Sequence, residues 1–145
     1  MRKFARFVKL ESSDRRLLIR AAYWLAIARI MLVAIPFRRL SERLSSRCAL
    51  DDLQLDPDRE LLLKIGRAVA MAANSVPWRS DCFPQTIAAR KLLERHGYGS
   101  TIHIGVARDE GEGLAAHAWL TCGDTVVTGG ANLERYTELH RIPAK

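Results

Sequence analysis

A cysteine and a histidine in the C-terminal half of the chain have the residue types and the setting for thiol chemistry. Cys82 stands in the opening turn of a helix predicted over 82–96, and His117 stands on a predicted strand. A helix N-terminus presents unpaired N–H groups and a positive dipole end, which favour a thiolate and can receive an oxyanion. Position alone leaves two interpretations open: a nucleophile with its base, or a cysteine and a histidine packed in a core.

The other two cysteines fit structural roles. Along the strand that carries His117, alternation places Trp119 on the same face as the histidine and Cys122 on the opposite face. We therefore expect Cys122, like Cys48, to be a core or turn residue.

No metal site is expected from the cysteines and histidines. A structural zinc site needs four ligands, which usually come in closely spaced pairs along the chain. No paired spacing occurs among the candidate ligands, which are Cys82, His103, His117 and Cys122.

Three further helices are predicted before the one that carries Cys82. Apolar periodicity and breaker residues place them over residues 14–35, 37–50 and 57–73. N-caps are expected at 12–14 for the first helix and at Asp56 for the third, with Pro57 as the first helical residue.

Strands follow the helices. β-branched residues predict one strand over 100–107, and two more, over 116–122 and 125–128, flank a two-residue turn at Gly123 and Asp124. Helices first and strands afterwards indicate an α+β domain.

Length and charge narrow the class of protein. The 145 residues suffice for one domain with a real core, and 9 Gly and 5 Pro are too few for a fibrous chain. Residues 1–48 carry 12 Lys and Arg against 3 Asp and Glu, so the net charge of +7 belongs to the N-terminal third. We divide the chain into a basic helical region, 1–50, and a core, 51–145, within one unit.

The cysteine count and the apolar segments bear on location. Three cysteines without a CxxC pair, and no secretory signal, indicate a reducing cytoplasm. Arg29 divides the most apolar stretch, 21–37, into two runs that are each too short to span a membrane. We expect a buried helix there, and a helix lying on a membrane surface is the alternative, because arginines flank the stretch.

The sequence around the two reactive residues resembles a known family. The segments VPWRSDCFPQTIAARKLLERHGYGSTIHIGVA and AHAWLTCGDTVVTGG are similar to the leader peptidases of lasso-peptide biosynthesis, in the transglutaminase-like cysteine protease superfamily. The similarity runs from Val76 to about Leu139. It implies a papain-like or transglutaminase-like core over 51–145, with the nucleophile helix packed on an antiparallel sheet. It also implies Cys82 as nucleophile and His117 as base, with no cofactor.

The third member of a catalytic triad departs from the family pattern. Many relatives place an aspartate on the strand after the histidine hairpin, where it orients the imidazole. In a regular hairpin His117 falls opposite Gly130, and Asp124 lies at the far end, approaching ~20 Å away. The candidates to hold the imidazole are Thr128, Asn132 and a backbone carbonyl near Gly129 and Gly130.

Three residues could line a substrate groove. Trp78 and Gln85 flank Cys82, and Trp119 shares the face of His117. Packing at the helix start, and burial of Trp119 in the sheet, are the structural alternatives.

The basic helices suggest a protein partner. Their arginines have few interleaved aromatics and no DNA-reading motif, so nucleic acid is not expected. The residues before Val76 resemble the peptidase's own helices, so the resemblance implies a stand-alone peptidase that works with a separate leader-recognition protein. Docking is expected at Arg38, Arg39 and Arg43, with a solvated surface as the alternative.

The resemblance implies a cysteine peptidase that cuts the leader from a ribosomally made lasso-peptide precursor and passes the core peptide to an ATP-dependent cyclase. One alternative is an acyltransferase or transglutaminase that uses the same cysteine and histidine. Another is a non-catalytic binding or scaffolding protein.

Overall fold

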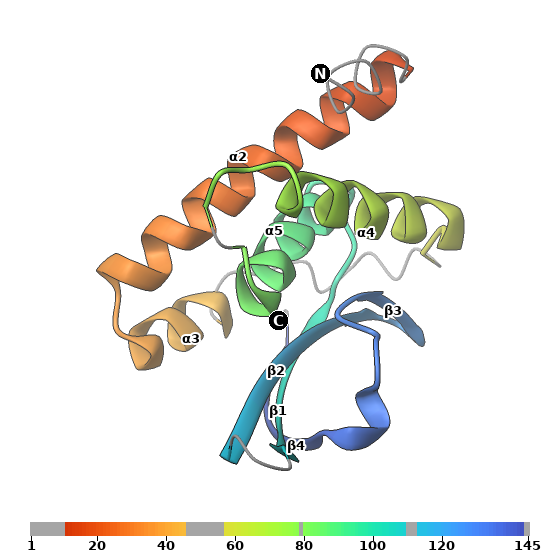
Figure 1. Cartoon of the computed structure of the whole chain (residues 1–145). Helices are drawn as coiled ribbons and strands as arrows, with labels where there is room; N and C mark the ends of the chain where they lie inside the picture. The colour runs from red at the N-terminus through yellow and green to blue at the C-terminus, as the bar shows by residue number, and fades with distance from the viewer. Residues whose placement is uncertain (1–10, 46–56, 79, 110–112, 144–145) are drawn as a thin grey trace.

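A layer of helices covers one side of a four-stranded sheet (Figure 1). The computed structural model describes residues 11–45, 57–78, 80–109 and 113–143. The helices are α2 (Ser12–Ala34), α3 (Phe37–Ser45), α4 (Arg59–Ala73) and α5 (Cys82–Glu94). The strands are β1 (Thr101–Asp109), β2 (Gly113–Cys122), β3 (Thr125–Thr128) and β4 (Thr137–Pro143), with the 3₁₀ helix η1 (Leu133–Arg135) before β4. The predicted α+β class is confirmed.

Two helix starts differ from the prediction. α2 begins after Glu11, which occupies the N-cap position without a side-chain cap bond. α4 is capped by Asp58, whose carboxylate accepts the N–H of Glu60 at 2.9 Å. The predicted cap at Asp56 is therefore wrong, and Pro57 precedes the helix instead of opening it. Asp56 itself and the last part of the predicted helix 37–50 lie outside the described residues.

The sheet is antiparallel throughout its described pairs, in the order β3-β2-β1-β4. At the predicted two-residue turn, Cys122 pairs with Thr125, and Gly123 has φ 54°, as the first central residue of a type II′ turn requires. The hairpin prediction is confirmed at its closed end.

A β-bulge changes the register of this hairpin away from the turn. After Thr121 the pairing shifts, so Leu120 pairs with Thr128, one residue later than in a regular hairpin. β3 ends there. The expected position of Gly130 opposite His117 is therefore wrong, because the extra residue breaks the count.

β4 is not predicted by the sequence pattern. Its residues are mostly exposed, and Ile142 is its one buried side chain. A strand needs alternating burial to leave a period-two signal, and this edge strand has none.

α5 lies between the other helices and the sheet, in contact with α2, α4, β2 and β3. Its buried residues are Pro84, Thr86, Ile87, Ala88, Ala89, Arg90, Leu92 and Leu93. All four described helices and the sheet contribute to the same apolar core. The position of Cys82 is thus set by the most enclosed helix of the described fold.

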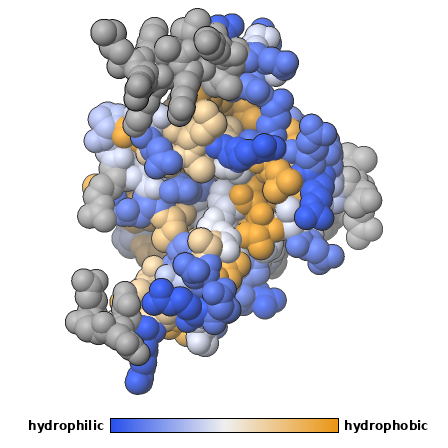
Figure 2. Space-filling view, turned by 45° about the vertical axis from the view of Figure 1, so that its right-hand side comes forward, coloured by the Kyte–Doolittle hydropathy of each residue, from blue (hydrophilic) through white to orange (hydrophobic). Residues whose placement is uncertain are grey.

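α2 is apolar on both of its faces. Ala21, Leu25 and Ala28 are buried against the core, whereas Ile30 and Val33 are exposed on the other side. Within the described residues, α2 is the one helix long and apolar enough to cross a membrane by length and composition, a test that a core helix also passes. Figure 2 shows apolar patches interrupting a hydrophilic surface on one side of the molecule.

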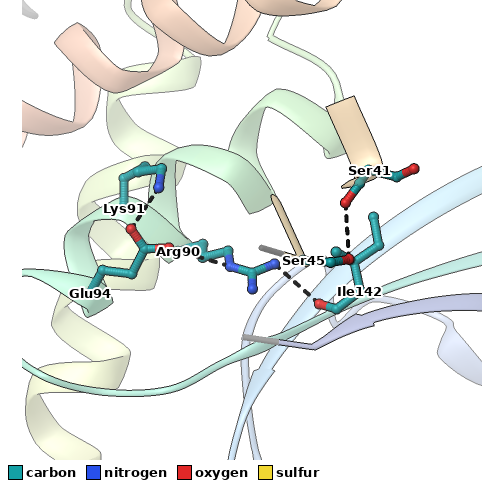
Figure 3. Close-up of polar contacts among 6 residues, drawn as sticks. All are labelled: Ser41, Ser45, Arg90, Lys91, Glu94 and Ile142. Carbon is teal, nitrogen blue, oxygen red and sulfur yellow. Dashed lines mark hydrogen bonds and ion pairs between the residues drawn. The ribbon is translucent and has the colours of Figure 1, made fainter. Parts of the chain in front are cut away.

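The largest fully buried side chain belongs to a charged residue, Arg90. Its Nη1 donates to the carbonyl of Ile142 in β4 at 3.1 Å, and its Nε lies 3.5 Å from Glu94 (Figure 3). Glu94 also binds Lys91, at 2.6 Å. The guanidinium therefore joins the central helix to the last strand.

We predict that Arg90→Ala lowers the free energy of unfolding by about 3–5 kcal/mol, because it removes one partner of a buried ionic contact and leaves a void. Arg90→Met, which keeps most of the volume without a charge, should restore most of that loss. Arg95→Ala, at an exposed position of the same helix end, should change stability by less than about 0.5 kcal/mol. Urea unfolding measures all three, and an Arg90→Ala variant as stable as Arg95→Ala would contradict the prediction.

Candidate active site

Cys82 is the first residue of α5, and its side chain is half-buried. Asp81 holds the N-cap position, but its side chain makes no cap hydrogen bond; the N–H of Gln85 reaches its carbonyl at 3.4 Å. Pro84 has no N–H to donate. Because Cys82 and Phe83 belong to the first turn, their N–H groups have no intrahelical acceptor, and they can bind an acceptor outside the helix, such as the oxyanion of a carbonyl attacked by the thiol.

The turn before α5 is fastened by Gln85. Its side-chain amide donates to the carbonyl of Ser80 at 2.7 Å, so this residue, expected in a substrate groove, holds the backbone that leads into Cys82. Trp78 lies exposed in the preceding bend. Of the two, Trp78 is the more exposed, and it precedes Cys82 by four residues.

His117 is bound by a backbone carbonyl. Its Nε2 donates to the carbonyl oxygen of Gly129 at 2.8 Å. A carbonyl only accepts hydrogen bonds, so the proton of the neutral ring sits on Nε2 and Nδ1 carries the basic lone pair. The described residues thus assign Nδ1 as the nitrogen that can take a proton.

Gly129 reaches this position because it lacks a side chain. Its φ is 74°, and a Cβ there would lie 2.5 Å from the carbonyl oxygen of Ala118. Only glycine adopts this conformation readily in so close a contact. The same backbone turn aims the Gly129 carbonyl at the imidazole.

The two side chains proposed to hold the imidazole lie elsewhere. Thr128 is buried opposite Leu120, and within the described part of the chain its hydroxyl has no hydrogen-bond partner. Asn132 is exposed in a left-handed conformation, φ 54°, before η1. Of the open candidates, the structure places the carbonyl at His117.

Aromatic rings enclose the imidazole of His117. The ring of Tyr136 packs against it at 4.8 Å between centroids, and Trp119 lies at 6.2 Å on the same sheet face. Trp119 is itself stacked on His103, with 4° between the ring planes. Because Trp119 is buried, it supports the imidazole and leaves little surface for a substrate.

His103 is fixed at both ring nitrogens. Nδ1 lies 2.8 Å from a carboxylate oxygen of Glu138, and Nε2 lies 2.9 Å from the hydroxyl of Thr121. The hydrogen bond from Arg141, followed by that from His103, lowers the pKa of Glu138. This network fixes the ring of His103 and so sets the plane on which Trp119 stacks.

The structure does not join Cys82 and His117 by a hydrogen bond within the described residues. Alternation along β2 projects His117 from the face opposite Leu120 and Cys122, which pack toward the helices. α5 packs on β2, so Cys82 and His117 lie on neighbouring elements, but Cys82 belongs to the helical side of the sheet and His117 to the opposite side.

The remaining cysteines differ from Cys82. Cys122 is buried in the core, as expected from alternation, and burial raises the pKa of its thiol. Cys48 lies outside the described residues. In the part of the chain that the structure describes, no group of three or more His, Cys, Asp or Glu side chains could hold a metal ion.

Comparison with known proteins identifies the family. The profile of the transglutaminase-like superfamily matches residues 31–141, so the chain belongs to this superfamily. No curated protein and no solved structure matches the chain. The superfamily includes cysteine peptidases and acyltransferases, commonly with a Cys-His-Asp set of residues. In this chain the described partner of His117 is a carbonyl in place of a carboxylate.

The bond to Gly129 predicts the tautomer of His117. In two-bond nitrogen-proton spectra of protein with isotope-labelled histidine, the neutral ring should carry its proton on Nε2, because the carbonyl accepts it there. His117→Asn assigns the signal. A ring protonated at Nδ1, or an equal mixture of tautomers, would show that this hydrogen bond does not form in solution.

Proposed function

We propose that this protein is a cysteine peptidase that removes the leader from a ribosomally made lasso-peptide precursor in the cytoplasm. The observation that carries the proposal is a thiol at the first residue of a helix that packs on the strand of His117, whose Nε2 is occupied by a carbonyl and whose Nδ1 keeps its lone pair. Membership of a superfamily that includes cysteine peptidases supports the chemistry. The resemblance of residues 76–139 to lasso leader peptidases supports the substrate class.

In the proposed reaction, Nδ1 of His117 takes the proton of the Cys82 thiol, and the sulfur attacks the scissile carbonyl carbon. The N–H groups at the start of α5 bind the resulting oxyanion. The C–N bond then breaks, and His117 gives its proton to the leaving amine. Water, deprotonated by His117, hydrolyses the thioester, which releases a carboxylate and restores the thiol.

Substrate binding must bring Cys82 and His117 together. In this structure His117 projects from the face of the sheet opposite the helices, so the reaction requires the first turn of α5 or the sheet edge to move, beyond the tightening of an existing hydrogen bond. The Cys82 end of α5 is the part that can respond, because Asp81 is exposed and Cys82 half-buried, whereas Ile87 and Arg90 further along are buried.

The proposed partners are a separate leader-recognition protein, the precursor peptide and an ATP-dependent cyclase. Arg38, Arg39 and Arg43 lie exposed on α3, whose Leu40 and Leu44 are buried. At the start of α3, the ring of Phe37 packs on Phe83 at 5.7 Å between centroids. A protein docked on these arginines would therefore lie close to Cys82.

An acyltransferase on the same two residues is the second candidate, and the superfamily supports it. It differs in the last step, where an amine in place of water attacks the thioester. The mass of the product separates the two: hydrolysis adds water to the cut peptide, whereas transfer joins it to the amine.

We predict that Cys82→Ala abolishes cleavage of the precursor while the fold is retained, because a half-buried thiol at a helix start leaves little void. Cleavage is followed by mass spectrometry and folding by circular dichroism. Cys48→Ala and Cys122→Ala are the matched controls and should keep activity.

His117→Ala should have the same effect on cleavage and should also slow the alkylation of Cys82 by iodoacetamide near neutral pH, since the base is gone. Loss of cleavage with unchanged alkylation would mean that His117 acts without touching the thiol. Retained cleavage in Cys82→Ala would overturn the peptidase proposal.

We predict that cleavage is slow without the leader-recognition protein and rises with its concentration, because that protein raises the local concentration of substrate. Replacing Arg38, Arg39 and Arg43 together by Glu should remove most of this stimulation and leave basal cleavage unchanged. The control reverses three other exposed arginines, Arg59, Arg67 and Arg95. Equal stimulation of both triple variants would show that α3 is only a solvated surface.

A further inference from the structure

The outer face of α2 is an apolar stripe without a partner in the described structure. Ile19, Tyr23, Ile30 and Val33 follow one another at helical spacing and are 58%, 58%, 61% and 76% exposed. We call these four residues the outer stripe. They lie opposite the buried stripe of α2, and a helix that is apolar all round is normally covered on both sides. Figure 1 shows this helix along the outside of the helical layer, away from the sheet.

The charges beside the outer stripe are positive. Arg16, Arg20 and Arg29 are exposed on α2. The single acidic residue of the helix, Asp14, is paired with Lys64 of α4 at 2.7 Å and lies on the inner side. An apolar stripe flanked by arginines matches the boundary of an anionic bilayer, where the arginines reach the phosphates and the apolar side chains enter the acyl region.

The inner face of α2 decides between lying on a membrane and crossing one. Ala21, Leu25 and Ala28 are fully buried against the core, so a crossing helix would have to leave α4 and α5 and expose their apolar surface. Arg29 would also stand within the hydrocarbon, where a charge is costly. The helix can keep its packing only if it lies flat.

The aromatic residues agree with a flat orientation. Tyr23 is exposed beside Trp24, with their rings edge to face at 5.3 Å, and tyrosine and tryptophan are enriched at the level of the lipid headgroups. The 23 residues of α2 make a helix about 35 Å long, and the outer stripe takes up about 21 Å of it, from Ile19 to Val33. The other three side chains of the outer stripe, Ile19, Ile30 and Val33, are aliphatic, and they carry no hydrogen-bonding group for a polar protein surface.

We propose that the outer stripe of α2 rests on an anionic lipid surface, with Arg16, Arg20 and Arg29 on the phosphates. This membrane contact does not depend on the proposed peptidase activity. The bilayer would hold the protein by the helical layer and leave the sheet on the other side free.

The test is flotation of the full chain with vesicles, made either of phosphatidylcholine alone or of phosphatidylcholine with phosphatidylglycerol. The wild type should bind the anionic vesicles and not the neutral ones, and salt should weaken binding. Replacing Ile19, Ile30 and Val33 together by Gln should lower binding at least ~tenfold, because the apolar area is lost. The matched control is Leu114→Gln with Leu139→Gln, two side chains that are 72% and 65% exposed on the sheet.

Replacing Arg16, Arg20 and Arg29 by Gln should lower binding to anionic vesicles at low salt and should narrow the difference between the two vesicle types. Circular dichroism checks that each variant is folded.

Equal vesicle binding by the wild type and the stripe variant would overturn the proposal. So would light scattering that shows a wild-type dimer and a monomeric stripe variant, since a second copy would then cover the stripe. A stripe variant that binds vesicles normally but loses stimulation by the leader-recognition protein would assign the stripe to that protein.

Discussion

The burial of a charged arginine inside the central helix is the constraint on which the rest of the fold depends. Arg90 is fully buried, and moving its guanidinium out of water is tolerated only where hydrogen bonds and an opposite charge compensate it. Glu94 supplies the charge from the same helix, but the carbonyl of Ile142 comes from the far end of the chain. β4 has almost no apolar side chains that face the core. The hydrogen bond from Arg90 and the burial of Ile142 therefore help to fix the position of this last strand. Fixing β4 beside β1 also fixes Glu138, which holds His103.

The candidate site divides between the two layers. The helices determine Cys82, because α5 is enclosed on all sides beyond its first turn, and the sheet determines His117 through Gly129, Tyr136 and Trp119. A carbonyl fixes the tautomer of the imidazole as a carboxylate would, but it brings a dipole in place of a full negative charge. It therefore stabilises an imidazolium less. In such a site, more of the stability of the thiolate-imidazolium pair must come from the helix N-terminus at Cys82.

Apolar periodicity and turn or breaker residues predict local elements from the sequence. Features that depend on close contacts between backbone segments are not predicted. The helix over 82–96 and the turn at Gly123 were accessible because their signals are local. The bulge that shifts Thr128 could not be predicted. The four residues of β3 are all β-branched, and no residue type among them marks which one is the extra residue. Gly66 illustrates the same limit: in a helix interior it reads as a weak point, yet a Cβ there would lie 2.2 Å from the carbonyl oxygen of Val127, so it permits α4 to approach β3. The hydrogen-bond partner of His117 is a backbone carbonyl, and because every residue has one, the residue type cannot identify this partner from the sequence.

Because the site is divided between the helices and the sheet, a ligand bound to the outer helical surfaces contacts only the layer that carries Cys82. Both exposed helical surfaces, the outer stripe of α2 and the arginines of α3, belong to the layer that carries Cys82, and Phe37 connects them to the first turn of α5 through Phe83. Neither surface belongs to the network around His117. A lipid or protein bound to these helices would act on the layer that carries the thiol, whereas the contacts of the imidazole lie on the other face of the sheet. Since a misplacement of about 1 Å between reacting groups can change a rate on the order of 10²-fold, the α5–β2 interface becomes the element through which docking would control the chemical step.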